Sequence, residues 1–233
     1  MRKIYYRDAV REALDEEMAR DPMVMMIGED VGPNGGTWKA NLGLWEKYGD
    51  LRMKDSPISE SGIVGMGVGM ALTGMRPIVE IMFSDFMLVA MDQIANQMAK
   101  ITYMSGGQRG VPMVIRTTIG LGRASAAQHS QCLNSLLAYF PGMKIAVPSD
   151  AYTAKGLLKT AIRDNAPVVV VEHRMQYSQQ FDMPAVDQHL AGIRPEVVLP
   201  QLAHFVLDEI QFLLVQADFL ADEIGRASCR ERV

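Results

Sequence analysis

The chain has 233 residues, a hydrophobic fraction of 48%, a charged fraction of 21% and a formal net charge of −4 at pH 7. These values are typical of a soluble globular protein and exclude the basic surface that nucleic-acid binding requires. No apolar run reaches the roughly 18–20 residues that span a bilayer. The N-terminus lacks an apolar signal core, and Cys132 and Cys229 are too few for a disulfide framework. We therefore expect a cytoplasmic protein with no membrane or nucleic-acid partner.

The first fifth of the chain predicts a helix, a strand and a long loop. Apolar residues recur at three- to four-residue spacing from Tyr6 to Arg20, which predicts an amphipathic helix. Asp21-Pro22 ends it, because a residue before proline avoids helical geometry. The apolar run from Met23 to Ile27 predicts a strand, and Gly28 to Gly49 predicts a loop. Long loops in compact domains are often functional.

The stretch DSPISESGIVGMGVGMALTG predicts a helix that begins near Ser59 and Glu60. Its interior glycines each cost about 0.8–1 kcal/mol relative to alanine. Their spacing is not that of a dinucleotide-binding G-x-G-x-x-G motif. Gly62, Gly65 and Gly69 fall on one helix face, so we interpret them as a surface for close packing of another helix, within the chain or between subunits.

The middle of the chain continues with a strand from Pro77 to Met82 and a helix from about Asp85 to Met104. The polar face of that helix fits either solvent or a seam between subunits; its residues are Asp92, Gln93, Asn96, Gln97 and Lys100. A strand from Val111 to Arg116, a glycine-rich loop from Thr117 to Ala127 and a helix from about Gln128 to Tyr139 follow.

The next segment repeats the strand–helix–strand order. Lys144 to Val147 predicts a strand, Ser149 or Asp150 caps a helix that ends at Arg163, and Val168 to Val171 predicts a strand buried on both faces. Apolar strands alternating with helices indicate an α/β domain with a doubly wound, mostly parallel sheet. Such sheets bind ligands beyond the carboxyl ends of their strands.

The sequence changes character after residue 177. We expect residues 1–177 to form one domain and residues 178–222 to be a linker or the remnant of a further domain. The last eleven residues, EIGRASCRERV, resemble a translated sequencing adapter, so we interpret residues 223–233 as a scar on a truncated chain. This tail carries three arginines and two glutamates, a charge of +1, which leaves −5 on the remainder.

Two residues are candidates for chemistry, each with a structural alternative. Glu60 is either a first-turn acid that favours the helix dipole or, flanked by Ile58 and Ile63, a desolvated carboxylate with a raised pKa. His129, in SAAQHSQ, is either a capping histidine or an active-site histidine on a loop beyond a strand end.

Several motifs in order resemble the beta subunit of the thiamine diphosphate-dependent 2-oxo acid dehydrogenases, of the pyruvate or acetoin type. They are IGEDVG, KDSPISESGIVGMGVGMALTGMRPIVEIMFSDF, MDQIANQMAKITYMSGGQ, AAQHSQ and GLLKTAIRDNAPVVVVEH. The resemblance covers roughly residues 2–177. It implies the pyrimidine-binding module of the transketolase-like fold, in agreement with the α/β pattern.

The resemblance assigns roles to particular residues. It implies that Glu60 hydrogen-bonds the pyrimidine N1′ of thiamine diphosphate and that Phe86 stacks on the pyrimidine ring. His129 is implied in substrate binding and in acyl transfer to a lipoyl group. Neighbours of the ring are Glu29, Ile58 and Met82. The resemblance also implies a potassium site of main-chain carbonyls, from Met113, Ala161, Ile162, Asp164 and Ala166; a helix end does leave carbonyls unpaired.

The sequence contains no G-D-G motif of the kind that precedes the magnesium-binding asparagine in thiamine diphosphate enzymes. The resemblance therefore implies that an alpha subunit supplies magnesium and the diphosphate half of the site, in an alpha2 beta2 tetramer that feeds a lipoyl acyltransferase core. The implied reaction is oxidative decarboxylation of a small 2-oxo acid, foremost pyruvate. Alternatives are an acetoin or branched-chain substrate, a truncated non-catalytic module that keeps only partner-binding surface, and a transketolase-like sugar enzyme.

Overall fold

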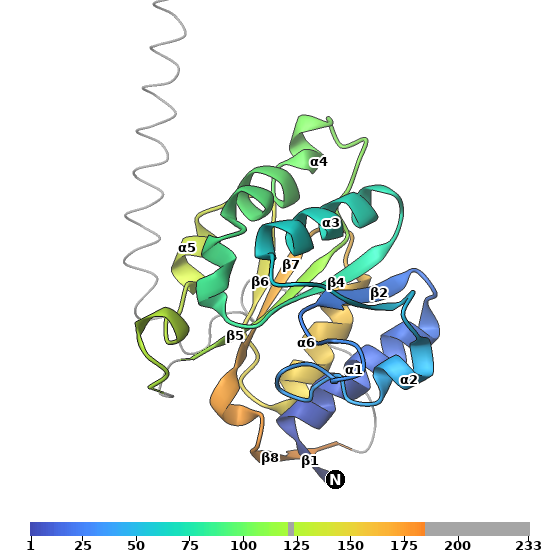
Figure 1. Cartoon of the computed structure of the whole chain (residues 1–233), viewed down its shortest axis with the longest axis vertical. Helices are drawn as coiled ribbons and strands as arrows, with labels where there is room; N and C mark the ends of the chain where they lie inside the picture. Colours follow the sequence, from blue (N-terminus) through green and yellow to red (C-terminus); the bar gives the residue numbers. More distant parts are fainter. Residues whose placement is uncertain (121–123, 185–233) are drawn as a thin grey trace, which may run out of the picture. The chain divides into compact units, whose positions relative to one another are not determined.

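The computed structural model describes residues 1–120 and 124–184 of the chain. A sheet of six parallel strands has the order β3-β2-β4-β5-β7-β6, with helices on both faces (Figure 1). Its strands are β2 (Val24–Gly28), β3 (Met53–Asp55), β4 (Arg76–Ile81), β5 (Val114–Ile119), β6 (Lys144–Ala146) and β7 (Val168–His173). The predicted doubly wound, mostly parallel α/β fold is confirmed.

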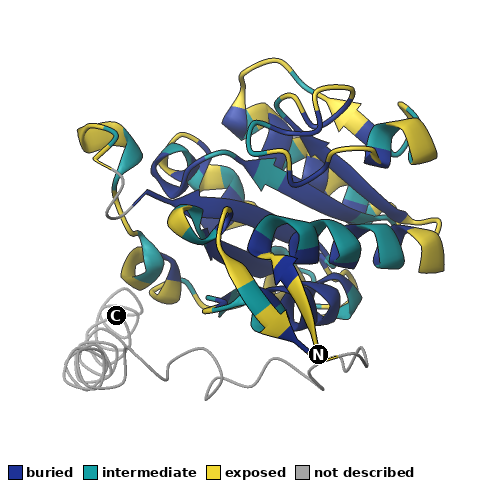
Figure 2. Ribbon diagram, turned by 90° about the horizontal axis from the view of Figure 1, so that it is seen from below, coloured by how far each residue is buried: buried dark blue, intermediate teal, exposed yellow. Residues whose placement is uncertain are grey.

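Two hydrophobic cores lie on opposite faces of this sheet, and alternate side chains of a strand belong to one core and the other. Val168 and Val170 belong to the core under α1 (Tyr6–Arg20) and α6 (Ala151–Arg163). Val169 and Val171 belong to the core under α3 (Glu60–Leu72). Successive side chains of a strand point to opposite faces, so a β-branched run is needed where both faces are covered. Figure 2 shows the central strands as buried.

Helices α1 and α6 lie against each other and are joined by ion pairs. Lys155 contacts Glu12 at 2.9 Å and Glu16 at 2.6 Å, and Arg163 contacts Glu17 at 2.5 Å. Asp150 is the residue that caps α6: its side chain accepts the Thr153 N–H in a capping box. Such a cap contributes about 1 kcal/mol, so the sequence alternative of Ser149 is resolved in favour of Asp150.

The glycines of α3 have unequal surroundings. A Cβ on Gly67 would lie 2.6 Å from Cγ2 of Val79, so this glycine lets the helix approach β4 closely. A Cβ on Gly65 would lie 3.4 Å from Gln93, and one on Gly69 would meet nothing within 4 Å. Among the described residues, the glycine of α3 that packs closely against β4 is therefore Gly67. Gly67 is not on the predicted packing face of Gly62, Gly65 and Gly69.

Two predicted helices are broken in the structure. Residues 85–104 form a 3-10 turn η1 (Ser84–Leu88), a π-helical segment η2 (Gln93–Met98) and α4 (Ile101–Met104). Residues 128–139 form a 3-10 turn η3 (Ala127–His129) and α5 (Asn134–Ala138). In the second segment the Gln131 N–H is donated to Asp85 and not to an intrahelical carbonyl.

Several short elements lie where the sequence predicts none. The predicted loop of residues 28–49 contains the short helix α2 (Leu44–Tyr48). Strand β1 (Arg2–Tyr5) pairs antiparallel with β8 (Gln180–Met183), and β8 lies beyond the expected domain boundary at residue 177. A further 3-10 turn is η4 (Arg174–Gln176). Most of the predicted linker and the whole predicted scar, residues 185–233, fall outside the described residues. Within the described ranges no helix is long and apolar enough to cross a bilayer.

Candidate active site

The predicted site residues lie on segments that follow the carboxyl ends of β2, β3, β4 and β5. Strands β2 and β4 are neighbours in the sheet, with Gly28 opposite Glu80. Glu29 directly follows β2, and Met82 directly follows β4. Phe86 lies on η1, whose chain continues from Met82, and the Phe86 ring centroid is 5.1 Å from that of His129 on η3. This is the edge where an open α/β sheet binds ligands.

Glu60 is the first residue of α3, and only 9% of it is exposed. Its carboxylate makes no hydrogen bond and no ion pair to any described residue, so both oxygens can accept from a ligand. Glu29 lies close enough for the two charges to interact: burial, then Glu60, then Asp30 raise the pKa of Glu29 above its ordinary value. Ile63 is buried as expected, but Ile58 is 79% exposed and does not shield Glu60.

His129 contacts two aromatic rings. Its ring centroid is 5.0 Å from Phe83 and 5.1 Å from Phe86, and the planes are nearly perpendicular at 77° and 83°. The centroids of Phe83 and Phe86 are 5.7 Å apart, so the three rings contact one another. Trp38, from the loop after β2, lies 5.5 Å from Phe83. His129 Nδ1 is buried without a hydrogen-bond partner among the described residues. Sequence reasoning missed Phe83 and Trp38, although Phe83 lies in the quoted motif MFSDF.

A buried ion network underlies the site. Arg116 of β5 is 2% exposed; its Nε donates to Glu172 at 2.8 Å and its Nη1 to Glu80 at 2.8 Å. Burial opposes the charge on Arg116, but Glu172 and then Glu80 outweigh it and raise the Arg116 pKa. The Tyr177 hydroxyl also donates to Glu172, and Asn41 donates to Glu80 at 2.9 Å, which ties the loop after β2 to the sheet.

The sequence carries a signal for this network beyond the motifs discussed above. The strand sequences VIRTTI, PIVEI and VVVVEH each contain one charged residue among apolar ones. Buried charges are rare unless they are paired, so three of them in strands of one parallel sheet indicate mutual contact. A cavity of about 10 Å³ lies beside the network, against Trp38, Glu80 and Arg116. This volume suffices for about one water molecule.

The five predicted potassium ligands gather at the opposite, amino-terminal edge of the sheet. There Arg76 donates to the carbonyl of Ile162 at 2.8 Å and to that of Asp164 at 2.5 Å. The Met113 carbonyl accepts from Val168, and the Ala161 carbonyl accepts from Asp164. Each carbonyl oxygen has a second lone pair, but the carbonyls of Ile162 and Asp164 already accept from a guanidinium.

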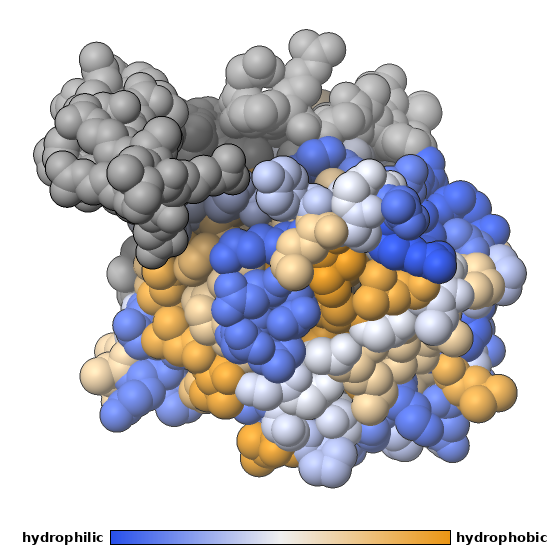
Figure 3. Space-filling model, turned by 90° about the horizontal axis from the view of Figure 1, so that it is seen from above, coloured by the Kyte–Doolittle hydropathy of each residue, from blue (hydrophilic) through white to orange (hydrophobic). Residues whose placement is uncertain are grey.

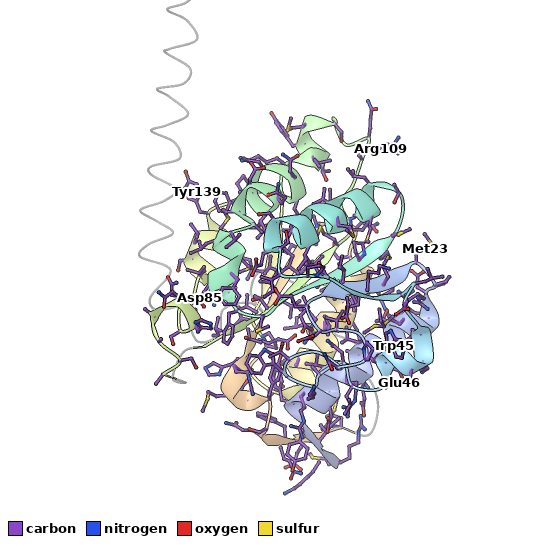
Figure 4. The ribbon with its side chains drawn as sticks, in the orientation of Figure 1. Met23, Trp45, Glu46, Asp85, Arg109 and Tyr139 are labelled. Atoms are coloured by element: carbon purple, nitrogen blue, oxygen red, sulfur yellow. The ribbon has the colours of Figure 1, made fainter. Side chains whose placement is uncertain are left out.

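A cavity of about 470 Å³ also lies at this amino-terminal edge, against Thr73, Gly74, Arg109 and Asn165. Figure 4 shows Asp85 and Arg109 on different sides of the molecule, as expected for residues at opposite ends of the strands. The cavity is therefore no part of the Glu60 site. No group of three His, Cys, Asp or Glu side chains in residues 1–120 and 124–184 could hold a metal ion.

A family described as transketolase, pyrimidine binding domain matches residues 2–180. The chain belongs to this family. This pyrimidine-binding domain is 48% identical over 199 residues to the pyruvate dehydrogenase E1 component subunit beta of Porphyra purpurea, a match that covers 85% of this chain and 60% of the relative. It is 46% identical over 182 residues to the mitochondrial pyruvate dehydrogenase E1 component subunit beta of Homo sapiens, a match that covers 78% of this chain and 51% of the relative. The chain thus spans between half and about three fifths of these relatives' length.

The pyrimidine-binding domain is also similar to a solved structure described as split gene transketolase, inactive beta4 tetramer. The TM-score is 0.60 at 22% identity, and the match covers 82% of this chain and 57% of the other. At this identity the likeness supports the fold alone, and it agrees with the parallel sheet described above.

Proposed function

We propose that this pyrimidine-binding domain is part of the beta subunit of the decarboxylating component of a 2-oxo acid dehydrogenase, with pyruvate as substrate and acyl transfer to lipoyl groups as outcome. One observation carries the proposal: Glu60 is a buried carboxylate, without a partner among the described residues, at the start of α3 and beside Glu29. The similarity to pyruvate dehydrogenase beta subunits supports the choice of pyruvate.

The residues of the site fit an aminopyrimidine. An unpaired carboxylate accepts a ring N–H, and the Phe86 ring offers a flat apolar face for stacking. Ile58 and Met82 are proposed as further neighbours of the pyrimidine. Thiamine diphosphate, once bound, supplies a nucleophilic carbon and an electron sink for loss of carbon dioxide from a 2-oxo acid.

The protein's own contribution is proton control and orientation. Glu60 would accept the N–H of a pyrimidine ring nitrogen, and the burial of Glu60 would strengthen that hydrogen bond. Burial, and then the nearby charge of Glu60, raise the pKa of Glu29, the second acid of the proposed site. Because Nδ1 of His129 is buried, the ring nitrogen Nε2 is the one that would meet the substrate.

The remaining parts of the site belong to partners in this proposal. An alpha subunit holds magnesium and the diphosphate, two copies of each subunit form an alpha2 beta2 tetramer, and a lipoyl acyltransferase core receives the acyl group. The proposed location is the cytoplasm, although the bovine and human relatives carry the word mitochondrial in their names.

Potassium is proposed at the carbonyls of Met113, Ala161, Ile162, Asp164 and Ala166, with Arg76 limiting its affinity by charge repulsion. Thermal unfolding in KCl and in NaCl at equal ionic strength tests this. Potassium should raise the melting temperature, and Arg76→Met should enlarge that difference, each variant being compared with its own NaCl value. Equal melting temperatures in both salts for both variants would count against the site.

The main proposal is tested with the chain co-expressed with an alpha subunit and supplied with thiamine diphosphate, magnesium and pyruvate. We expect decarboxylation that Glu60→Gln reduces by at least about 100-fold, since the ring nitrogen loses its charged acceptor. Glu46→Gln, an exposed site on α2, is the matched control. Full activity of Glu60→Gln would refute the role of Glu60, whereas a stable complex without turnover would support a non-catalytic, partner-binding module.

A further inference from the structure

The backbone that carries His129 is held by two buried side chains of η1. Asp85 Oδ1 accepts from Gln131 N at 3.2 Å and from Gln131 Nε2 at 2.9 Å. Ser84 Oγ donates to the Gln131 carbonyl at 3.2 Å. Ser84 is 1% exposed and Asp85 is 5% exposed, so water competes little for these bonds. They fix a residue that lies only two positions after His129.

A third contact comes from Gly120 at the end of β5. A Cβ on Gly120 would lie 1.8 Å from the His129 carbonyl oxygen. Contacts under about 3 Å do not occur for real side chains, so the close passage of these two backbones requires glycine. The His129 backbone is therefore held from the sheet by Gly120 and from η1 by Ser84 and Asp85.

The same turn also sets the rings that enclose the imidazole. Phe83 and Phe86 flank the Ser84–Asp85 pair in sequence and contact His129 at 5.0 and 5.1 Å. An active-site histidine is usually oriented by a hydrogen bond to its second ring nitrogen. Here Nδ1 has no partner among the described residues, and the contacts with Phe83 and Phe86 that the structure describes bear on the ring itself.

We propose that Asp85 is a positioning residue that acts through Gln131 to hold the His129 imidazole against Phe83 and Phe86, with Ser84 and Gly120 as supporting contacts. The inference rests on the proposed function for its catalytic meaning, but its structural content is independent of that function. Asp85 is assigned no contact with substrate or cofactor.

Histidine-selective NMR of the whole chain tests the positioning without any activity. The rings of Phe83 and Phe86 should displace the His129 ring protons from their free-histidine shifts, and His129→Gln assigns the signal. Asp85→Leu should move the signal toward the free-histidine position, whereas Asp85→Asn, which keeps an acceptor oxygen, should preserve it. Asp150→Leu controls for destabilisation, since it also removes a carboxylate that accepts a backbone N–H. An unmoved signal in Asp85→Leu would overturn the proposal.

A double-mutant cycle in the assembled enzyme tests the catalytic consequence. Misplacement of a reacting group by about 1 Å can cost about 100-fold in rate, so we expect Asp85→Leu to lower kcat by about 10- to 100-fold. If Asp85 acts through His129, Asp85→Leu should cost nothing further in a His129→Ala background. Additive losses would show a separate role and reject the positioning. Absence of turnover in the parent enzyme would reject the proposed function, and the NMR result would still decide the proposal.

Discussion

At the scale of single residues, Arg116 is the residue that neutralises the buried carboxylates of the sheet. It pairs with both Glu172 and Glu80, which are carboxylates on the neighbouring strands β7 and β4. Removing one partner of a buried pair leaves uncompensated charge and typically costs 3–5 kcal/mol. We therefore expect Arg116→Met to lower the free energy of unfolding by about 3–5 kcal/mol in urea denaturation.

The matched control for this substitution is Arg109→Met, because Arg109 is exposed and should change stability by less than about 0.5 kcal/mol. If Arg116→Met does not fold, Tyr177→Phe tests the same network more gently. It removes only the hydroxyl that donates to Glu172 and should cost about 1–2 kcal/mol. Unchanged stability in both variants would show that the network contributes nothing to folding.

At the scale of elements, the α1–α6 contact should make stability depend on acid. Burial alone would raise the pKa of Glu17, but hydrogen bonds from Arg163 and Arg20 outweigh it and hold that pKa below its ordinary value. A lowered folded-state pKa gives stability that is present above the unfolded-state pKa and lost as pH falls through the folded-state value. The loss should therefore occur between roughly pH 5 and pH 3.

Glu17→Gln should remove part of this acid dependence. We expect it to cost about 1 kcal/mol at pH 7, since both arginines are partly exposed and solvent screens the pairs. The difference from the parent chain should shrink as pH falls toward 3. Urea denaturation at several pH values measures it, with Glu46→Gln as an exposed control. A constant difference at every pH would contradict the ion-pair explanation.

The glycines of α3 give a second prediction for an element. Gly69→Ala should stabilise the isolated chain by up to about 0.8–1 kcal/mol, because the added methyl group meets nothing and alanine is the better helix former. Gly67→Ala should destabilise it by about 1–3 kcal/mol, because its Cβ would lie 2.6 Å from Val79. The two chemically identical changes control for each other, and effects of the same sign would refute this account of α3.

The accuracy with which the sequence predicts secondary structure also differs between elements. The bounds of α1 were predicted correctly, and α6 and the central strands to within a few residues, because their burial pattern is periodic and local. The broken segment near His129 includes a bond between Asp85 and Gln131, which lie 46 residues apart, so no local pattern specifies it. The roles of Glu60 and His129 came from the family resemblance, and the Arg116 network depends on a strand order that no local pattern specifies.

At the scale of the whole molecule, α3 presents an exposed strip that fits assembly with a partner. Gly62, Met66 and Gly69 are exposed along one side of the helix, and Met66 is 50% exposed. Nearby apolar side chains are also exposed, among them Val89, whose carbonyl accepts from Ser61 of α3. Apolar side chains also reach the surface on the face shown in Figure 3. Small residues on such a strip allow the backbone of another helix to approach closely.

We therefore expect Gly69→Leu to leave the isolated chain folded, since the position is open, and to weaken its association with an alpha subunit by at least about 10-fold. The larger side chain would hold the partner's backbone away from α3 and leave part of the strip exposed to water. Thermal unfolding checks the fold, and gel filtration of the co-expressed subunits measures association. Glu46→Leu adds the same side chain on α2 and should not change assembly. Normal association of Gly69→Leu would place the alpha subunit on another surface of the chain.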